Sequence, residues 1–163
     1  GFEVIKVVSV EKIITDAGEA KKLVDVTYES LVRAIKILKP GVTLGDIGYE
    51  IQSFVEKEGF SVVRDFCGHG IGRLFHEEPS VVHYGKKNQG MKIKEGMVFT
   101  IDPMIWIPEE KLYIRIEDVA LVTRNGVENL SEFVPSSINK IEEMIKEKGI
   151  TEFRPSKNLP LKK

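Results

Sequence analysis

Cysteine is almost absent from this 163-residue sequence, which contains one. A single cysteine excludes a disulfide within the chain and favours a reducing compartment, so we expect a cytoplasmic protein. No apolar run reaches the roughly 18 residues that a membrane-spanning helix needs, and no signal-peptide pattern is present. Neither sign of charge dominates, because the net charge is −1. Composition therefore gives no argument for binding nucleic acid or an anionic membrane.

The remaining composition is that of an ordinary folded domain. Hydrophobic residues make up 42% of the sequence and charged residues 30%, values typical of a protein that buries a core. The sequence contains neither an internal repeat nor a low-complexity segment. We expect one domain over 1–149, followed by a basic tail over 150–163.

Hydrophobic spacing predicts a mixture of helices and strands. Apolar residues recur at intervals of three and four over 19–38, which predicts a helix that Pro40-Gly41 ends. Thr43-Leu-Gly-Asp46 resembles a capping box at the start of a second helix, which stops at Gly59. The other elements expected are β structure at 2–10, strands at 60–63, 97–101 and 112–123, a tight turn at Asn125-Gly126 into a strand at 127–130, and a last helix from Ser136 or Ser137 to Glu147.

Residues that can bind metal or transfer protons are concentrated in one segment, Cys67-Gly-His-Gly-Ile-Gly-Arg-Leu-Phe-His-Glu-Glu-Pro79. Its thirteen residues include two histidines, three glycines and two glutamates. Glycine lacks a side chain, so it suits places where the backbone turns or approaches another group closely. The imidazoles of His69 and His76 can bind metal or move protons near neutral pH. Packing alone does not account for this density, and we interpret the segment as a loop that forms a site.

Two downstream segments carry carboxylates on predicted strands. The apolar strand that begins at Met97 ends on Asp102, and the strand at 113–122 contains Arg115 and Glu117 two residues apart. Side chains two apart on a strand share a face, so Arg115 and Glu117 point the same way into a largely apolar sheet. Buried charges need partners or a metal. One imidazole (His69) with two carboxylates (Asp102 and Glu117) suits a divalent ion such as Mn, Fe, Co or Zn.

With these motifs the chain resembles the pita-bread metallopeptidases, a family that includes methionine aminopeptidases, Xaa-Pro aminopeptidases and prolidases. The resemblance runs from about Glu19 to Pro135. The segment from Gly68 to Pro79 is similar to the histidine loop of methionine aminopeptidases, whereas Arg115-Ile-Glu-Asp118 is more similar to the Xaa-Pro enzymes. The resemblance implies an α+β fold of the pita-bread (creatinase/aminopeptidase) type. Such a fold has a curved antiparallel sheet with helices on its outer face, and 1–149 would form part of its catalytic domain.

The resemblance also implies a metal site and a function. It makes His69, Asp102 and Glu117 metal ligands, with Glu117 as the carboxylate that bridges two divalent ions (Co, Mn, Fe or Zn). Arg115 matches an arginine that steadies this bridging carboxylate. The implied function is a metal-dependent aminopeptidase that hydrolyses the N-terminal residue of peptides, either methionine aminopeptidase-like or Xaa-Pro peptidase-like.

Two further residues receive roles from the resemblance. His76 matches the catalytic histidine that contacts the scissile peptide and stabilises the tetrahedral intermediate. Phe75 would line the pocket for the substrate side chain, so both residues would bind substrate. The partners implied are peptide N-termini, with no nucleic acid and no membrane.

Two features depart from the family pattern. The residue before Pro103 is usually Glu, and here it is Asp102, a carboxylate shorter by one methylene that can still bind metal. Two aspartates that complete a five-ligand site in the family have no recognisable counterpart in 1–16, which offers Glu3, Glu11 and Asp16. We therefore expect an incomplete fold with one metal or none, completed by a homo-oligomer or a missing N-terminal segment. The alternative function is a non-catalytic pita-bread module or half-domain that binds peptide or protein.

Each candidate also has an interpretation without catalysis, and the sequence leaves these open. His69 and His76 can be hydrogen-bonded loop histidines, and Asp102 can belong to a turn that ends a strand. Arg115 and Glu117 can be an ordinary same-face ion pair. A creatinase-like amide hydrolase on the same fold is a third function, without a motif of its own here. The residues expected to have structural or surface roles are Cys67, Glu77, Glu78, His83 and Trp106.

Overall fold

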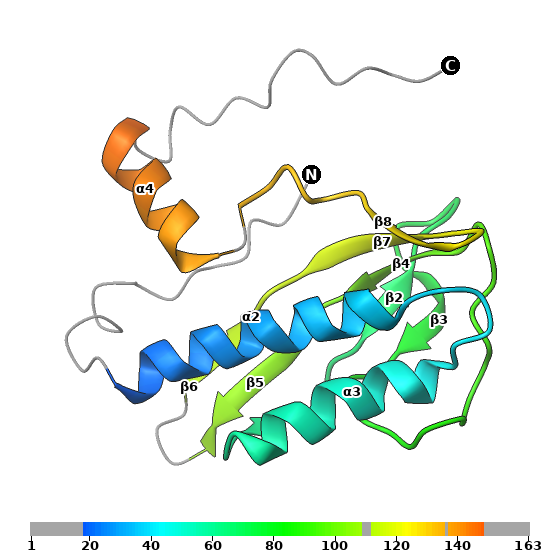
Figure 1. Ribbon diagram of the computed structural model, residues 1–163, viewed down its shortest axis with the longest axis horizontal. Coiled ribbons are helices and arrows are strands. Elements are labelled where there is room, and N and C mark those ends of the chain that lie inside the picture. The colour runs from blue at the N-terminus through cyan, green and yellow to red at the C-terminus, as the bar shows by residue number, and fades with distance from the viewer. Residues whose placement is uncertain (1–17, 109–111, 136, 149–163) are drawn as a thin grey trace.

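The structure, a computed structural model, describes residues 18–108, 112–135 and 137–148. It is an α+β arrangement in which every described strand pair is antiparallel (Figure 1). The helices are α2 (Glu19–Ile37), α3 (Leu44–Lys57) and α4 (Ile138–Lys148). The strands are β1 (Ser61–Val62), β2 (Gly68–Gly70), β3 (Glu77–Val81), β4 (Val98–Ile101), β5 (Met104–Ile107), β6 (Leu112–Arg115), β7 (Asp118–Thr123) and β8 (Gly126–Asn129).

Helix α2 forms because its apolar residues repeat at helical spacing and bury one stripe. Leu23, Leu31 and Ala34 in that stripe are fully buried. Leu38 is already extended, two residues before Pro40, which cannot continue a helix. The helix predicted from the spacing is therefore confirmed.

Helix α3 begins at the predicted capping box. The Thr43 hydroxyl accepts the N–H of Asp46 (3.2 Å), and an Asp46 carboxylate oxygen accepts the N–H of Thr43 (2.8 Å). These bonds satisfy two N–H groups that have no partner within the helix. Ile47, Ile51 and Val55 of this helix are fully buried.

The strands form two sheets joined by one long bent hairpin. The larger sheet has the order β3-β2-β4-β7-β8 and the smaller one the order β1-β5-β6. Strand β4 leads into β5, and β6 leads into β7, each after two residues. The pairs Ile101–Asp118 and Met104–Arg115 bracket this junction, so residues 102–103 face 116–117 without a change of register.

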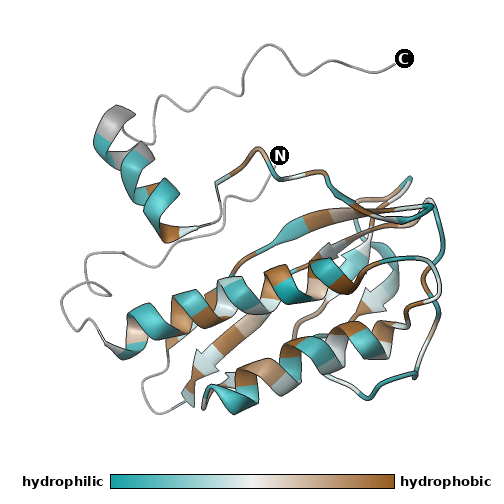
Figure 2. Cartoon of the chain, viewed as in Figure 1, coloured by the Kyte–Doolittle hydropathy of each residue, from teal (hydrophilic) through white to brown (hydrophobic). Residues whose placement is uncertain are grey.

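The apolar core lies between the bent sheet and helices α2 and α3. Helix α2 contacts β4, β5, β6 and β8, so it spans both sheets, whereas α3 contacts β1 and β3. Figure 1 shows both helices lying over one face of the strands. Figure 2 shows hydrophobic residues alternating with hydrophilic ones along each helix, as expected where one side is buried. Phe99, Ile101 and Ile105 are fully buried on the strands.

The structure corrects several expectations about strands. The strand predicted at 112–123 is two strands in different sheets, because its partner strand crosses from one sheet to the other at Pro103, which has no N–H for a ladder. Strand β5 was not predicted. The histidine segment is not simply a loop, since it contains β2 and the start of β3. The expectations for 2–10 and for the tail at 150–163 lie outside the described residues.

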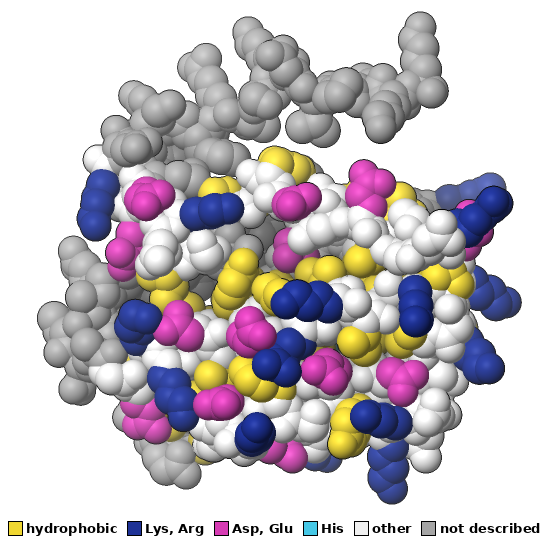
Figure 3. All heavy atoms as spheres, viewed as in Figure 1, with side chains coloured by type: hydrophobic (Ala, Val, Ile, Leu, Met, Phe, Trp, Pro, Cys, Tyr) yellow, Lys and Arg dark blue, Asp and Glu magenta, His cyan; other side chains and the backbone are white. Residues whose placement is uncertain are grey.

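The helix-covered face carries charges of both signs. Figure 3 shows acidic and basic side chains interspersed over it. Ion pairs along α2 include Lys21–Asp25 (2.7 Å) and Arg33–Glu29 (3.0 Å). Pairs at the protein surface such as these stabilise a protein only slightly. None of the described helices is long and apolar enough to cross a membrane.

Candidate active site

The junction between the two sheets brings three charged side chains together. In the shared register Asp102 stands opposite Glu117, and directly opposed residues of an antiparallel pair project from the same face. Arg115 lies two residues before Glu117, so it projects from that face as well. Ile101 and Ile105 are buried in the core, and the charged side chains therefore project from the opposite face.

Arg115 bridges the two carboxylates. Its guanidinium nitrogens lie 3.8 Å from Asp102 Oδ2 and 3.9 Å from Glu117 Oε2. Burial, and then the negative charge of Asp102, raises the pKa of Glu117 above its usual value, while the charges of Arg115, His69 and His76 act in the opposite direction. Both histidines therefore lie within electrostatic reach of Glu117.

Strand β2 places His69 between two glycines that have no room for a side chain. A Cβ on Gly68 would overlap the carbonyl oxygen of Thr100, and one on Gly70 would overlap that of Glu78. The His69 N–H donates to Thr100 Oγ1 (2.9 Å), and His69 Nδ1 lies 3.0 Å from the Gly70 carbonyl oxygen. With its proton on Nδ1 to make this bond, the ring keeps a free lone pair on Nε2 for a ligand.

The rings of His69, Phe75 and His76 form a cluster. The ring centroids of His69 and His76 are 4.2 Å apart, those of Phe75 and His76 4.6 Å, and those of His69 and Phe75 5.6 Å. Phe75 and His76 precede β3, and both are exposed. An exposed phenylalanine beside two imidazoles can contact an apolar group of a bound molecule. The structure thus brings Phe75 and His76, the two residues predicted to bind substrate, next to His69.

The predicted metal ligands fit a divalent ion in their chemistry, but they do not form a complete site by themselves. Buried Asp102 Oδ1 has no hydrogen-bond partner among the described residues, which fits an atom that binds a further group. Imidazole and carboxylate are donors that hold divalent transition ions. In the described ranges, however, no three His, Cys, Asp or Glu side chains converge closely enough to hold an ion. His69, Asp102 and Glu117 therefore do not meet at one point, and their role as ligands stays a prediction.

His83 belongs to this region, although sequence reasoning missed it as a functional candidate. Its side chain is fully buried, and its Nε2 lies 3.3 Å from both the backbone nitrogen and Oδ1 of Asp102. No motif in the segment Val-Val-His-Tyr distinguishes a buried histidine from an exposed one. Trp106, which was expected to pack, is 37% exposed. Glu77 and Glu78 are exposed, as expected, but they lie on β3 rather than in a loop.

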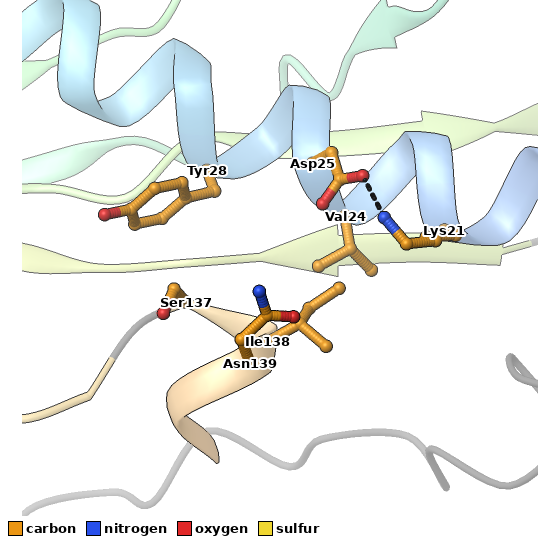
Figure 4. Close-up of a pocket in the computed structure, with 7 residues that line it drawn as sticks. All are labelled: Lys21, Val24, Asp25, Tyr28, Ser137, Ile138 and Asn139. Atoms are coloured by element: carbon orange, nitrogen blue, oxygen red, sulfur yellow. Dashed lines mark hydrogen bonds and ion pairs between the residues drawn. The ribbon is translucent and has the colours of Figure 1, made fainter. Parts of the chain in front are cut away.

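A hollow lies between α2 and the start of α4, away from the sheet junction (Figure 4). Its volume is about 230 Å³, smaller than most sites for small molecules. Val24 and Ile138 point toward each other there, and the charges of Lys21 and Asp25 are paired with each other at 2.7 Å. The residues that line it are Lys21, Val24, Asp25, Tyr28, Ser137, Ile138 and Asn139. With no imidazole and one paired carboxylate in this lining, the hollow is not a candidate for catalysis.

Comparison with known sequences matches the segment that carries these residues. The model of metallopeptidase family M24 matches residues 7–124. The chain belongs to metallopeptidase family M24. A methionine aminopeptidase of Rickettsia prowazekii is 54% identical over 89 residues, which cover 55% of this chain and 34% of that protein. The methionine aminopeptidase of Escherichia coli (strain K12) is 45% identical over 127 residues, which cover 68% of this chain and 48% of that protein.

Solved structures of M24 proteins share the fold. The methionine aminopeptidase from Rickettsia prowazekii superposes with a TM-score of 0.65 at 41% identity, covering 68% of this chain and 52% of that one. The X-Pro aminopeptidase from Thermotoga maritima MSB8 superposes with a TM-score of 0.64 at 31% identity. This match covers 74% of this chain and 33% of that one. The pita-bread fold expected from the sequence is confirmed. The chain spans about a third to a half of the length of these relatives.

Proposed function

We propose that this chain carries part of the active site of a metal-dependent aminopeptidase, an enzyme that removes the N-terminal residue of a peptide. The observation that supports this most strongly is the sheet junction, where Arg115 bridges Asp102 and Glu117. Asp102 Oδ1 is buried without a hydrogen-bond partner in the part of the chain that the structure describes, and such an oxygen is costly unless it binds a further group. The methionine aminopeptidase names of M24 relatives support the same chemistry.

In this proposal the junction residues hold the metal. His69 Nε2, Asp102 and Glu117 would be ligands, together with donors from outside the described residues, because these three do not converge by themselves. Arg115 keeps the carboxylates in place and offsets part of their negative charge. When bound, a divalent metal would supply an activated water and polarise the scissile carbonyl.

His76 is the proposed catalytic histidine. Its ring packs 4.2 Å from that of His69 and is exposed, so its N–H can reach a peptide bound beside the proposed ligands. A hydrogen-bond donor at this place stabilises the negative charge that develops on the carbonyl oxygen during attack by water. Phe75, exposed beside it, would contact the side chain of the first substrate residue.

Peptides with a free N-terminus are the proposed substrates. The apolar ring of Phe75 suits an apolar first residue such as methionine, and the relatives at 45% to 54% identity are named methionine aminopeptidases. The segment Arg115-Ile-Glu-Asp118 resembles the Xaa-Pro enzymes instead, so both peptide classes belong in the assay. The non-catalytic module considered from the sequence gains no support from these relatives, which carry peptidase names.

Hydrolysis of Met-peptides and Xaa-Pro peptides in the presence of Mn²⁺ or Co²⁺ tests this function. We expect turnover to be low in the wild-type chain, because the described residues do not complete a metal site. His76→Ala should lower that turnover by a further factor of roughly 10² to 10⁴, the range for losing an acid–base or oxyanion partner. The metal content should stay unchanged, because His76 is not a proposed ligand.

Glu95→Gln is a suitable control, since Glu95 is exposed and pairs with the exposed Arg124 (3.7 Å). It should leave both turnover and metal content at the wild-type level. Wild-type turnover in His76→Ala would contradict the role of His76, as would a loss of metal equal to that in His69→Ala. No hydrolysis of either peptide class by the wild-type chain at saturating metal would contradict aminopeptidase activity in this chain.

A further inference from the structure

His83 is a buried polar side chain that the proposed chemistry does not use. It lies two residues after β3, and its side chain is fully buried. Its Nε2 accepts the backbone N–H of Asp102 (3.3 Å), whereas Nδ1 has no partner among the described residues. An imidazole with one nitrogen unpaired costs more to bury than an apolar side chain of similar size. Packing alone therefore does not account for a histidine at this position.

The Asp102 N–H needs a partner of this kind because of its place in the fold. Ile101 makes the last pair between β4 and β7, and Pro103 has no N–H. Asp102 therefore carries the one backbone N–H of the two residues that cross from one sheet to the other. Asp102 is only 4% exposed, so its N–H must find a partner inside the protein. His83 Nε2 is that partner.

The direction of this hydrogen bond fixes what His83 does to the carboxylate. Nε2 can accept an N–H only through its lone pair, which places the ring proton on Nδ1. The same nitrogen lies 3.3 Å from Asp102 Oδ1, but without a proton it cannot donate to that oxygen. Among the described residues Oδ1 is accordingly left without a hydrogen bond. His83 thus holds the main chain of Asp102 without occupying its carboxylate.

We propose that His83 is a positioning residue that anchors the Asp102 N–H at the sheet junction, directs the carboxylate towards Arg115 and Glu117, and leaves Oδ1 open to a cation. Asp102 Oδ2 lies 3.8 Å from a guanidinium nitrogen of Arg115, so the carboxylate points towards Arg115. The cation part of this proposal rests on the proposed function, whereas the anchor does not. The two parts therefore need separate measurements.

Two variants of similar size distinguish an anchor from a space-filling residue. In His83→Gln the side-chain Oε1 reaches about the place of Nε2 and can accept the Asp102 N–H, whereas His83→Met fills the space with only a weak acceptor. NMR of the ring nitrogens in the wild-type chain should find the proton on Nδ1. Amide exchange at Asp102 should be about tenfold faster in His83→Met than in wild type, and close to wild type in His83→Gln.

Titration with Mn²⁺ measures the cation part. The affinity should fall roughly 10- to 100-fold in His83→Met, as for other residues that orient a metal ligand, and should recover in His83→Gln. Circular dichroism establishes that each variant is folded. If His83→Met does not fold, the ring proton in wild type and Asp102 exchange in His83→Gln decide the question.

A ring proton on Nε2 would contradict the proposal that His83 anchors the Asp102 N–H, because a protonated Nε2 cannot accept that hydrogen bond. Equal amide exchange at Asp102 and equal Mn²⁺ affinity in His83→Gln and His83→Met would also contradict the anchoring role. A side chain that only fills the space would then hold Asp102 as well as one that accepts its N–H. If the wild-type chain binds no Mn²⁺ and cleaves no peptide, the proposed function and the cation part fail together. The ring proton and the exchange rates would still decide whether His83 is an anchor.

Discussion

Gly68 and Gly70 are glycines because the neighbouring strands leave no room for a side chain. A Cβ on either would overlap a backbone carbonyl oxygen, on Thr100 of β4 or on Glu78 of β3. Backbone cannot move aside as the end of a long side chain can, so this close approach determines the place of β2. His69 lies between these glycines, and the spacing of the strands therefore fixes the place of its imidazole, which lies within electrostatic reach of Glu117.

Gly70→Ala should lower the free energy of unfolding by about 1–3 kcal/mol or more, because the added methyl group overlaps the backbone of Glu77 and Glu78. Gly126→Ala is the matched control, since a Cβ there meets nothing within 4 Å. It should change stability by less than about 0.5 kcal/mol. Urea unfolding of the three chains measures both effects. Equal midpoints for Gly70→Ala and wild type would show that the strands have room for a side chain.

The residues of the site could be predicted from the sequence to different degrees. His69 and His76 stand in a recognisable motif, and the alternation of strand residues places Arg115 on the face of Glu117. The pairing of Asp102 with Glu117 could not be derived, because it needs the register of two strands. The role of His83 could not be derived either, since it depends on a contact between residues nineteen positions apart that only the fold brings together.

At the scale of elements, the sequence predicts best where the signals are local. The capping box and the apolar spacing indicated α2 and α3 to within about two residues of their observed ends. The division of 112–123 into β6 and β7 was not predicted, because no glycine, proline or turn motif within 112–123 marks the break. The cause of that division, Pro103, lies on the opposite strand, so a reading of 112–123 alone does not reveal it.

Asp46 links the start of α3 to the loop before β4, and this link should depend on pH. Its carboxylate accepts the N–H groups of Thr43 and Asn88, both at 2.8 Å. The bond from Asn88, followed by those from Thr43, lowers the pKa of Asp46 below its usual value of 3.8. Asp46→Asn should therefore cost about 0.5–1 kcal/mol near neutral pH, a small value because the side chain is only partly buried.

The sign of the pH dependence follows from the lowered pKa of Asp46. A carboxylate with a lower pKa in the folded state contributes stability above the pKa of the unfolded chain and loses it as the pH falls through the folded value. The stability difference between wild type and Asp46→Asn should therefore shrink on acidification below about pH 4. Asp25→Asn, which removes an exposed pair with Lys21, is the control and should change little. A difference for Asp46→Asn that does not vary with pH would contradict this account.

At the scale of the whole molecule, apolar side chains are exposed around the candidate site. Phe66, Leu74 and Phe75 are 52%, 65% and 61% exposed, and β6 is an edge strand of the described smaller sheet. Exposed apolar groups and open strand edges favour association. We therefore expect a dimer or larger assembly, and Leu74→Ser should shift it towards the monomer. Light scattering after size exclusion measures this, and a monodisperse monomer of wild type at every concentration would contradict the expectation.

His69, Asp102 and Glu117 are the metal ligands proposed at the junction of the two sheets. Calorimetric titration of the chain with Mn²⁺ tests this assignment, with His69→Ala, Glu117→Gln and the surface control Glu95→Gln measured alongside wild type. We expect at most about one ion per wild-type chain, since these three donors would hold one ion only together with donors from outside the described residues. Affinity should fall at least about 100-fold in His69→Ala and Glu117→Gln and stay unchanged in Glu95→Gln. The same isotherm in all four proteins would contradict the assignment of His69 and Glu117 as ligands.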